Sequence, residues 1–178
     1  MSRMFRFLTA DEIEVKVKQV KEDGLVCLLY KTARTDMDLL DETVTPANWE
    51  NDYREIKGNL YAGIGIRQAD GSMVWKWDCG IESREDGEGN EKKGEASDAF
   101  KRAGFRWGIG RELYTSPFIW INPDKAEIRR YSSNGKNVFR CFDKFSVEKI
   151  AYDENTGRIT GLAIRNDSKK CRAFVWQA

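Results

Sequence analysis

The sequence predicts an α+β fold that contains an antiparallel β-meander, one long helix and a β-hairpin near the C-terminal end. Three observations lead to this class. Extended runs at residues 49–56, 60–67 and 73–81 alternate with turn-forming residues, residues 91–108 repeat apolar side chains at helical spacing, and alternating runs flank a turn at residues 153–157. With 178 residues, of which 40% are hydrophobic, the chain is expected to fold around one core.

The N-terminal segments predict a helix, a strand and a second helix. Thr9 and Glu12 form a capping-box pattern that favours a helix over residues 9–20, although the alternation of apolar and polar residues in the same segment also fits a strand. Residues 25–30 (LVCLLY) are typical of a short buried strand. Residues 33–44 repeat apolar side chains at helical spacing and predict an amphipathic helix.

The three central runs are predicted to pair as an antiparallel meander. Residues 57–59 (KGN) and 70–71 (DG) separate them, and both are typical of hairpin turns. Residues 83–93 contain two glycines and no large apolar side chain, so a loop is expected before the long helix.

The long helix at residues 91–108 is the most informative segment. At 100° per residue, Ala96, Phe100, Ala103 and Trp107 fall on one apolar arc that predicts the buried face. Basic side chains point away from this arc or flank it: Lys92, Lys93, Lys101, Arg102 and Arg106. Such a stripe can neutralise phosphates without reading a base sequence. The alternative is a solvated charged face, because acidic residues are interspersed among the basic ones.

Tryptophans offer a second possible contact with nucleic acid, because bases stack on indole rings. Trp49, Trp75, Trp77 and Trp107 are the candidates, and core packing is the alternative for all four. Trp75 and Trp77 share one face of their predicted strand, where half-exposed rings are expected.

The C-terminal part predicts mainly extended structure. Residues 118–122 are expected to be extended, residues 131–138 to form a polar loop, and residues 145–152 and 159–164 to pair as a hairpin.

Composition excludes several classes of function. Thirty Lys and Arg against 29 Asp and Glu give a net charge of +1, so binding to nucleic acid would depend on local clusters of charge. The chain has no histidine, which removes every catalytic triad that uses one and most zinc sites. Four widely spaced cysteines, none in a CxxC pair, are expected to be buried thiols: Cys27, Cys79, Cys141 and Cys171.

Neither a cofactor nor a metal is predicted. No GxxxxGK[ST] loop is present, which favours a function independent of ATP. The sequence also shows no apolar leader and no run of 18 apolar residues, so we expect a cytoplasmic protein without membrane contact.

Residues 91–114, EKKGEASDAFKRAGFRWGIGRELY, resemble the signature helix of the Rad fifty-two annealing family, whose phage-encoded members show a similar KGAASDAFKRAAVKWGIGRYLY. Residues 30–49 are similar to that family's YxxARxxxxxLDExxGPxNW segment, in the same order and spacing. The resemblance covers residues 8–121, about two-thirds of the chain. It implies an annealing core at residues 1–121 and a C-terminal extension at residues 122–178 that packs on the same domain.

The resemblance also implies how the core is built and assembled. The meander packs against the signature helix, and several subunits form a ring or arc. A groove around the assembly then holds single-stranded DNA by its backbone. The implied function is ATP-independent annealing of complementary strands in recombination and double-strand break repair, with no catalysis, and a single-strand-binding protein is left open as a partner.

The implied DNA contacts follow from matched positions. Lys101 and Arg102 match the family's lysine–arginine pair, Arg34 lies within one residue of a family arginine, and Lys93 matches another basic position. Arg106 is offset, because the next family arginine aligns with Phe105, and Lys92 adjoins Lys93.

A second DNA site of eukaryotic members uses a lysine where this chain has Ala69. Arg67 and Lys76 on the same hairpin are the candidate substitutes.

Two other functions remain as alternatives. A single-strand-binding module would bind DNA without speeding the pairing of strands. A metal-dependent nuclease would use Asp70 or Asp78 with Glu91, Lys92 and Lys93, although a glycine-rich segment suits rigid metal coordination poorly.

Overall fold

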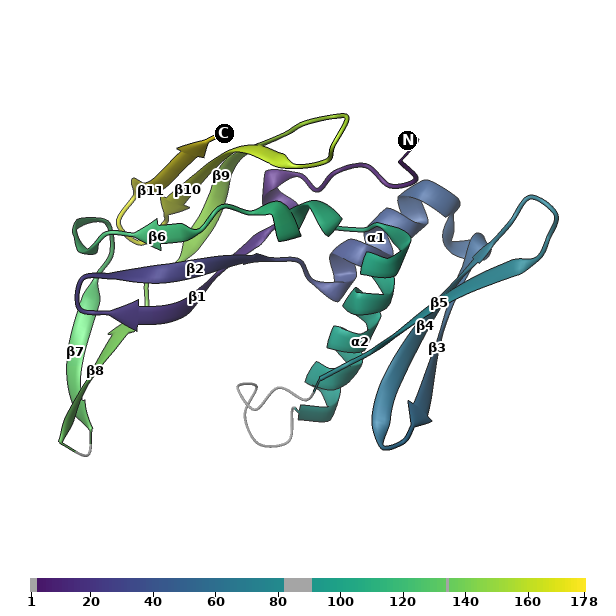
Figure 1. Cartoon of the computed structure of the whole chain (residues 1–178), viewed down its shortest axis with the longest axis horizontal. Helices are drawn as coiled ribbons and strands as arrows, with labels where there is room; N and C mark the ends of the chain where they lie inside the picture. Colours follow the sequence, from purple (N-terminus) through teal and green to yellow (C-terminus); the bar gives the residue numbers. More distant parts are fainter. Residues whose placement is uncertain (1–2, 82–90, 134) are drawn as a thin grey trace. The chain divides into compact units, whose positions relative to one another are not determined.

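The computed structural model describes residues 3–81, 91–133 and 135–178, and the chain divides into two compact units (Figure 1). Unit 1 comprises Met1–Arg6 and Lys31–Gly110, and unit 2 comprises Phe7–Tyr30 and Arg111–Ala178. After six residues of unit 1, the chain forms the first part of unit 2, then the rest of unit 1, and finally the remainder of unit 2. The predicted functional domains, residues 1–121 and 122–178, do not coincide with these two units, and they remain a prediction.

Unit 1 combines two α-helices with a three-stranded antiparallel sheet of order β3-β4-β5. Its elements are α1 (Ala33–Val44), β3 (Trp49–Ile56), β4 (Asn59–Arg67), β5 (Met73–Cys79) and α2 (Glu91–Trp107). Helix α2 packs against β4 and β5. The described core of the unit includes the buried side chains Phe5, Leu39, Leu40, Ala62, Ile64, Ile66, Ala99, Phe100, Ala103 and Ile109.

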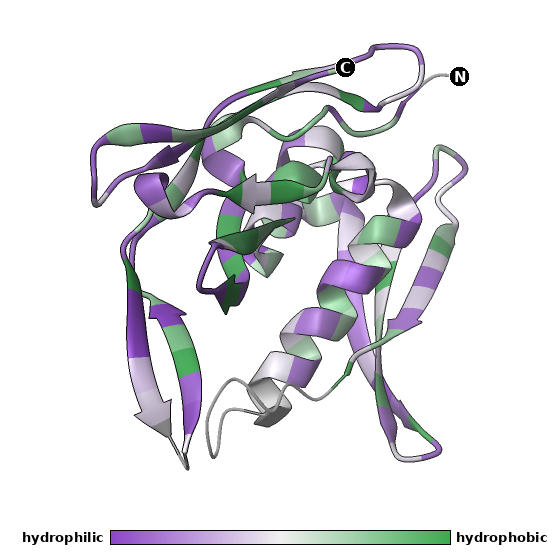
Figure 2. Cartoon of the chain, turned by 60° about the vertical axis from the view of Figure 1, so that its left-hand side comes forward, coloured by the Kyte–Doolittle hydropathy of each residue, from purple (hydrophilic) through white to green (hydrophobic). Residues whose placement is uncertain are grey.

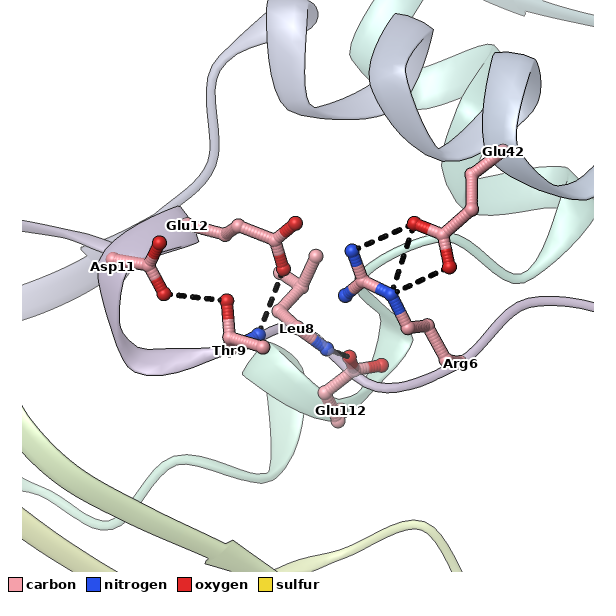
Figure 3. A network of polar contacts seen from close by, with 7 residues as sticks. All are labelled: Arg6, Leu8, Thr9, Asp11, Glu12, Glu42 and Glu112. Carbon is pink, nitrogen blue, oxygen red and sulfur yellow. Dashed lines mark hydrogen bonds and ion pairs between the residues drawn. The ribbon is translucent and has the colours of Figure 1, made fainter.

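Side-chain bonds fix α1 at both ends. The Thr32 hydroxyl accepts a hydrogen bond from the Thr35 amide and caps the start of the helix. Near the other end, Asp41 Oδ1 accepts a 2.7 Å hydrogen bond from Trp49 Nε1. Figure 3 shows the Arg6 guanidinium against the Glu42 carboxylate, to which Nε and Nη2 donate at 3.0 and 2.9 Å.

The link between α1 and β3 turns at Thr45. Its φ of 69° and ψ of 152° lie in a region that glycine adopts and a β-branched residue rarely does. The Thr45 hydroxyl accepts a 3.0 Å hydrogen bond from Asn48 Nδ2, which partly offsets the strain.

Unit 2 contains a six-stranded antiparallel sheet of order β11-β10-β9-β1-β2-β6. Its strands are β1 (Glu14–Lys21), β2 (Gly24–Tyr30), β6 (Ile119–Ile121), β9 (Phe145–Tyr152), β10 (Ile159–Asn166) and β11 (Cys171–Gln177). A separate two-stranded ribbon consists of β7 (Ile128–Ser133) and β8 (Lys136–Cys141). Leu25, Ile121, Leu162 and Ile164 are among the buried core residues of this unit.

The first residues of unit 2 are tied to its C-terminal part. Leu8 donates its amide to the buried Glu112 carboxylate at 2.8 Å (Figure 3), and its carbonyl accepts a 2.8 Å hydrogen bond from the Tyr152 hydroxyl. The Phe7 and Tyr152 rings stack with centroids 4.5 Å apart. The Thr9 amide donates to the Glu12 carboxylate at 2.8 Å, as the capping-box pattern predicts.

Most individual elements agree with the sequence. The predicted strands at residues 25–30, 49–56 and 60–67 and the helix at residues 33–44 are confirmed. The long helix ends one residue earlier than predicted, at Trp107. The extended segment near residue 120 and the predicted C-terminal hairpin, now β9 and β10, are also confirmed.

Two predicted elements are wrong. Residues 9–20 are predicted to be helical, but only Ala10–Glu12 form a short 3-10 turn, and strand β1 begins at Glu14. The alternation of apolar and polar residues thus outweighs the capping box. The predicted polar loop at residues 131–138 is instead the tip of the β7–β8 ribbon. It lacks apolar alternation because much of this ribbon faces solvent.

The predicted fold class is wrong as a description of the chain. Strands make up 47% of the structure, the described residues include only two α-helices, and the largest sheet has six strands. A meander packed on one long helix therefore does not describe the fold. The reason is that β9, β10 and the unpredicted β11 join β1 and β2 in one sheet.

Three further predictions concern the loop at residues 83–93, the burial of the cysteines and the absence of a membrane-spanning helix. The predicted loop at residues 83–93 falls mostly outside the described residues. All four cysteines are free thiols, but only Cys27 is buried, and burial, with a smaller effect of Cys141, raises the pKa of Cys27 to about 12. Within the described ranges, no helix combines the length and apolarity that crossing a membrane requires.

Candidate nucleic-acid interface

Helix α2 has one buried and one solvent-facing side. Ala99, Phe100 and Ala103 are at most 1% exposed, and Trp107 Nε1 donates a 2.9 Å hydrogen bond to the Ile64 carbonyl of β4. The predicted apolar arc therefore does face the sheet, with Ala99 as an additional buried member. Figure 2 shows the same helix banded between hydrophilic and hydrophobic residues.

The basic residues of α2 differ in how far their side chains are exposed to solvent. Arg102 and Arg106 are 43% and 56% exposed, whereas Lys101 is half-buried on the flank. This is the arrangement that the helical spacing predicts. Lys92 and Lys93 lie in the first turn, where only the backbone is described.

Asp78 on β5 lies between the two exposed arginines. Its carboxylate is 2.9 Å from Arg106 Nε and 3.6 Å from Arg102 Nε, and it is only 15% exposed. Burial acts to raise the pKa of Asp78, but hydrogen bonds from Arg106 and the Cys79 amide and the charges of both arginines hold it below its usual range. The cluster Asp78–Arg102–Arg106 therefore carries a net positive charge that is partly neutralised from within.

Lys76 extends this basic surface from the sheet. Its Nζ lies 4.2 Å from the centroid of the Trp107 ring and donates a 3.2 Å hydrogen bond to the Arg106 carbonyl. Lys76 pairs with Ile64 across the sheet and so points to the same face as α2. The predicted residue thus joins the α2 cluster.

A buried ion pair, Lys31–Asp36, contacts the backbone of α2 at Lys101. Lys31 Nζ contacts both carboxylate oxygens of Asp36, which is fully buried, and also donates to the Lys101 carbonyl at 3.3 Å. Burial raises the pKa of Asp36 to about 6, although the charges of Lys31 and Lys101 act to lower it. Gly104 permits this approach of the helices, since a Cβ there would lie 2.6 Å from Asp36 Oδ2.

Arg34 is exposed in the first turn of α1, two residues before Asp36. The Lys31–Asp36 pair brings this turn against α2. Arg34 and Lys101 therefore belong to two helices that are packed together within unit 1.

The other face of the sheet in unit 1 carries an aromatic platform. Trp75 and Trp77 stack with centroids 5.6 Å apart, and both are half-buried. They lie directly over Gly65 and Gly63, where a Cβ would come within 2.6 Å of each indole. Arg54 lies 4.4 Å from the Trp77 ring centroid. A flat indole with one face on the backbone can receive a base on its other face, but on Trp77 that other face lies under the Arg54 guanidinium.

Arg67 is exposed at the end of β4 and pairs with Met73. It therefore lies on the platform side of the sheet, opposite to Lys76. The two proposed substitutes for the missing lysine at Ala69 consequently do not form one cluster.

The sequence does not predict the role of several charged groups of this interface. Lys31, Asp36 and Arg54 belong to no motif of their own, and the sequence suggests Asp78 only as an alternative metal ligand. The packing of β5 on α2 brings Asp78 close to two arginines, and no spacing in the sequence predicts this contact. Among the side chains that the structure describes, no three or more Cys, Asp or Glu are grouped to hold a metal ion.

Comparisons with protein families and with curated proteins found no match. The chain matches none of the protein-family models, and no curated protein is significantly similar to it in sequence.

Proposed function

We propose that this protein binds single-stranded DNA without ATP and anneals complementary strands, working as a ring or arc of several subunits. The observation that supports this proposal most is the exposed basic side of α2, where Arg102 and Arg106 stand beside Lys101 on a helix fixed by its buried side. A rigid row of cations can bind phosphates of any base sequence. The resemblance of residues 91–114 assigns Lys101 and Arg102 to DNA, whereas the next family arginine aligns with Phe105 and not with Arg106.

Annealing breaks no covalent bond, so it requires no catalytic residue. It requires neutralisation of two phosphate backbones while the bases remain accessible. The α2 cluster suits this task because Asp78 moderates its charge, so that each contact is weak and exchangeable. Repetition around a ring then adds many weak contacts together.

The aromatic platform supports the same proposal from the opposite face of the sheet. Trp75 offers a stacking surface that tolerates any base, and Arg67 supplies positive charge on the same face. Arg54 covers Trp77 and is paired with Asp52 at 3.0 Å, so it adds less.

The decisive experiment is annealing of two complementary labelled oligonucleotides by the purified protein, with EDTA and without nucleotide. Acceleration of pairing by the natural protein supports the proposal. The Lys101→Gln/Arg102→Gln variant should anneal more slowly and bind all sequences more weakly, with the salt slope reduced by roughly 1 because single strands contribute about 0.7 for each phosphate contact. The charge-matched control Lys149→Gln/Lys169→Gln alters two exposed lysines of unit 2.

Two outcomes would contradict the proposal. Binding without acceleration would assign a single-strand-binding module instead. Equal effects of the α2 variant and its control would show that the α2 cluster does not contact DNA.

A further inference from the structure

The β7–β8 ribbon is a separate feature of unit 2. Within the described residues, its strands pair in a sheet only with each other, over the register Ile128↔Cys141 to Ser133↔Lys136, and β8 also contacts β1. Figures 1 and 2 both show the ribbon extending away from the six-stranded sheet of the same unit. Nothing in the function proposed above uses it.

The base of the ribbon is firmly anchored. Asp143, just after β8, accepts a 2.8 Å hydrogen bond from the Glu127 amide, just before β7. Asn166 of β10 is fully buried and donates to Asp143 Oδ2 at 2.7 Å and to the Lys125 carbonyl at 2.9 Å. The two ends of the ribbon are thus joined to each other and to the large sheet, so its outer part is presented in a defined direction.

The ribbon has an inner and an outer face. Ile128, Phe139 and Cys141 share one face and are half-buried. The opposite face consists of exposed side chains, which are Arg129, Tyr131, Lys136, Val138 and Arg140. We call this set the outer face of the ribbon.

Positive charge is concentrated on the ribbon. Residues 128–141 contain four Lys and Arg and no Asp or Glu, in a chain whose net charge is only +1. Arg129 and Arg140 are directly opposite in register, an arrangement that destabilises a sheet through like-charge repulsion. A bound anion would relieve this repulsion.

Internal carboxylates compensate this charge only in part. Arg129 pairs with Glu127 at 3.0 Å, but both side chains are 55% exposed, so solvent screens the pair. In the parts of the chain that the structure describes, no carboxylate forms an ion pair with Arg140 or Lys136.

An aromatic ring lies among these cations. Tyr131 is 41% exposed, and the Arg140 guanidinium lies 5.9 Å from its ring centroid. Exposed cations around an exposed ring match a chain that alternates phosphates with flat bases. An acidic peptide would use the cations but leave the ring without a stacking partner.

We propose that the outer face of the β7–β8 ribbon is a second binding surface for single-stranded DNA. Arg129, Lys136 and Arg140 bind phosphates, and Tyr131 stacks on a base. This inference takes its ligand from the function proposed above, but it rests on residues of unit 2 that the α2 cluster does not include. It gives the C-terminal region a direct part in holding DNA.

The test compares DNA binding of four full-length proteins by fluorescence anisotropy with labelled oligothymidine over a range of salt concentrations. They are the natural protein, the ribbon variant Arg129→Gln/Lys136→Gln/Arg140→Gln, the α2 variant Lys101→Gln/Arg102→Gln, and the control Lys149→Gln/Arg158→Gln/Lys169→Gln. The control removes the same charge as the ribbon variant from exposed positions of the same unit. Circular dichroism first verifies that all four are folded.

The ribbon variant should bind about tenfold more weakly, with a salt slope reduced by roughly 2 for three lost phosphate contacts, while the control changes little. Equal binding by ribbon variant and control would overturn the inference, and a weakened α2 variant in the same experiment would leave the proposed function standing. Conversely, loss of binding in the ribbon variant alone would support the ribbon and contradict the α2 assignment.

Two further measurements test the aromatic contact and the rival ligand. Tyr131→Ala should weaken binding roughly fivefold or more, whereas Tyr131→Phe, which keeps the ring, should not. If the ribbon variant loses binding to a labelled polyglutamate peptide but keeps binding to oligothymidine, the ribbon is a protein-docking surface and the inference is wrong.

Discussion

Thr45 is a residue whose backbone conformation opposes its side chain. The strain of its φ of 69° is set against one exposed hydrogen bond from Asn48. Replacement by glycine removes the steric cost, so Thr45→Gly should increase the free energy of unfolding by about 1 kcal/mol. Urea denaturation followed by circular dichroism measures the change. Thr45→Ala, which keeps the Cβ and loses the hydrogen bond, should be less stable than the natural protein, and the reverse order would contradict this account.

Asp36 makes stability depend on pH in an unusual direction. Its pKa is raised by burial to about 6 in the folded protein, from 3.8. The folded state therefore binds the proton more tightly than the unfolded state, and the resulting stabilisation, present below pH 4, is lost as the pH rises through 6. Asp36→Asn removes this titration.

The difference in stability between Asp36→Asn and the natural protein should thus shift in favour of the variant between about pH 4 and 6. Denaturation at several pH values in that range measures it. A shift in favour of the natural protein would show that the ion pair with Lys31 outweighs burial.

At the residue scale, the sequence predicts the direction of a side chain on a helix but not its partner on another element. Arg102 and Arg106 point to solvent, as the spacing of 100° per residue indicates. Lys31 and Asp36 are buried although both are charged, because they form a pair that is visible only after α1 and α2 are packed.

At the scale of elements, the contact between α2 and β5 determines how much of the positive charge of Arg102 and Arg106 is left to bind phosphate, because Asp78 pairs with both. Asp78→Asn removes the carboxylate that engages two arginines, so it should tighten binding to single-stranded DNA several-fold and increase the salt slope by about 1. It should also cost about 1 kcal/mol of stability, because the ion pairs are partly exposed.

The same variant separates annealing from nuclease chemistry. Anisotropy measures the binding, and an incubation with magnesium measures strand cleavage. Loss of a magnesium-dependent cleavage in Asp78→Asn, without tighter binding, would contradict the role assigned to Asp78 here.

Elements were predicted well where apolar periodicity was clear and poorly where tertiary packing chose between alternatives. Helix α1 and strands β3 and β4 follow from local pattern and turn residues. Strand β1 shows both a helix-start signal and strand alternation, and its pairing with β2 and β9 favours the strand. The exposed β7–β8 ribbon has no apolar face long enough to distinguish it from a loop.

At the scale of the whole molecule, the proposed annealing function predicts an assembly, because α2 carries only a modest number of cations. One subunit offers only a few phosphate contacts, so useful affinity depends on several subunits acting on one strand. The protein should therefore sediment as an oligomer of several subunits at micromolar concentration in sedimentation velocity. A strictly monomeric species, in the presence and absence of oligothymidine, would contradict the ring or arc.

The division of the chain between the two units could not be predicted, because no linker composition marks it. Residues 31–110 interrupt unit 2 between β2 and the segment that leads to β6. Strands from both sides of this insertion then form one sheet, which a search along the sequence for consecutive hairpins does not find.

This insertion has a consequence for the order of folding during synthesis. Strands β1 and β2 leave the ribosome before the main part of unit 1, but β6 and β9, which flank them, are made only after it. Unit 1 has its core elements together as soon as α2 has emerged, whereas the first hairpin keeps one edge unpaired until β6 has emerged and the other until β9 has emerged. The slow, long-range closure of the six-stranded sheet is therefore the step at which a nascent chain is most exposed to aggregation.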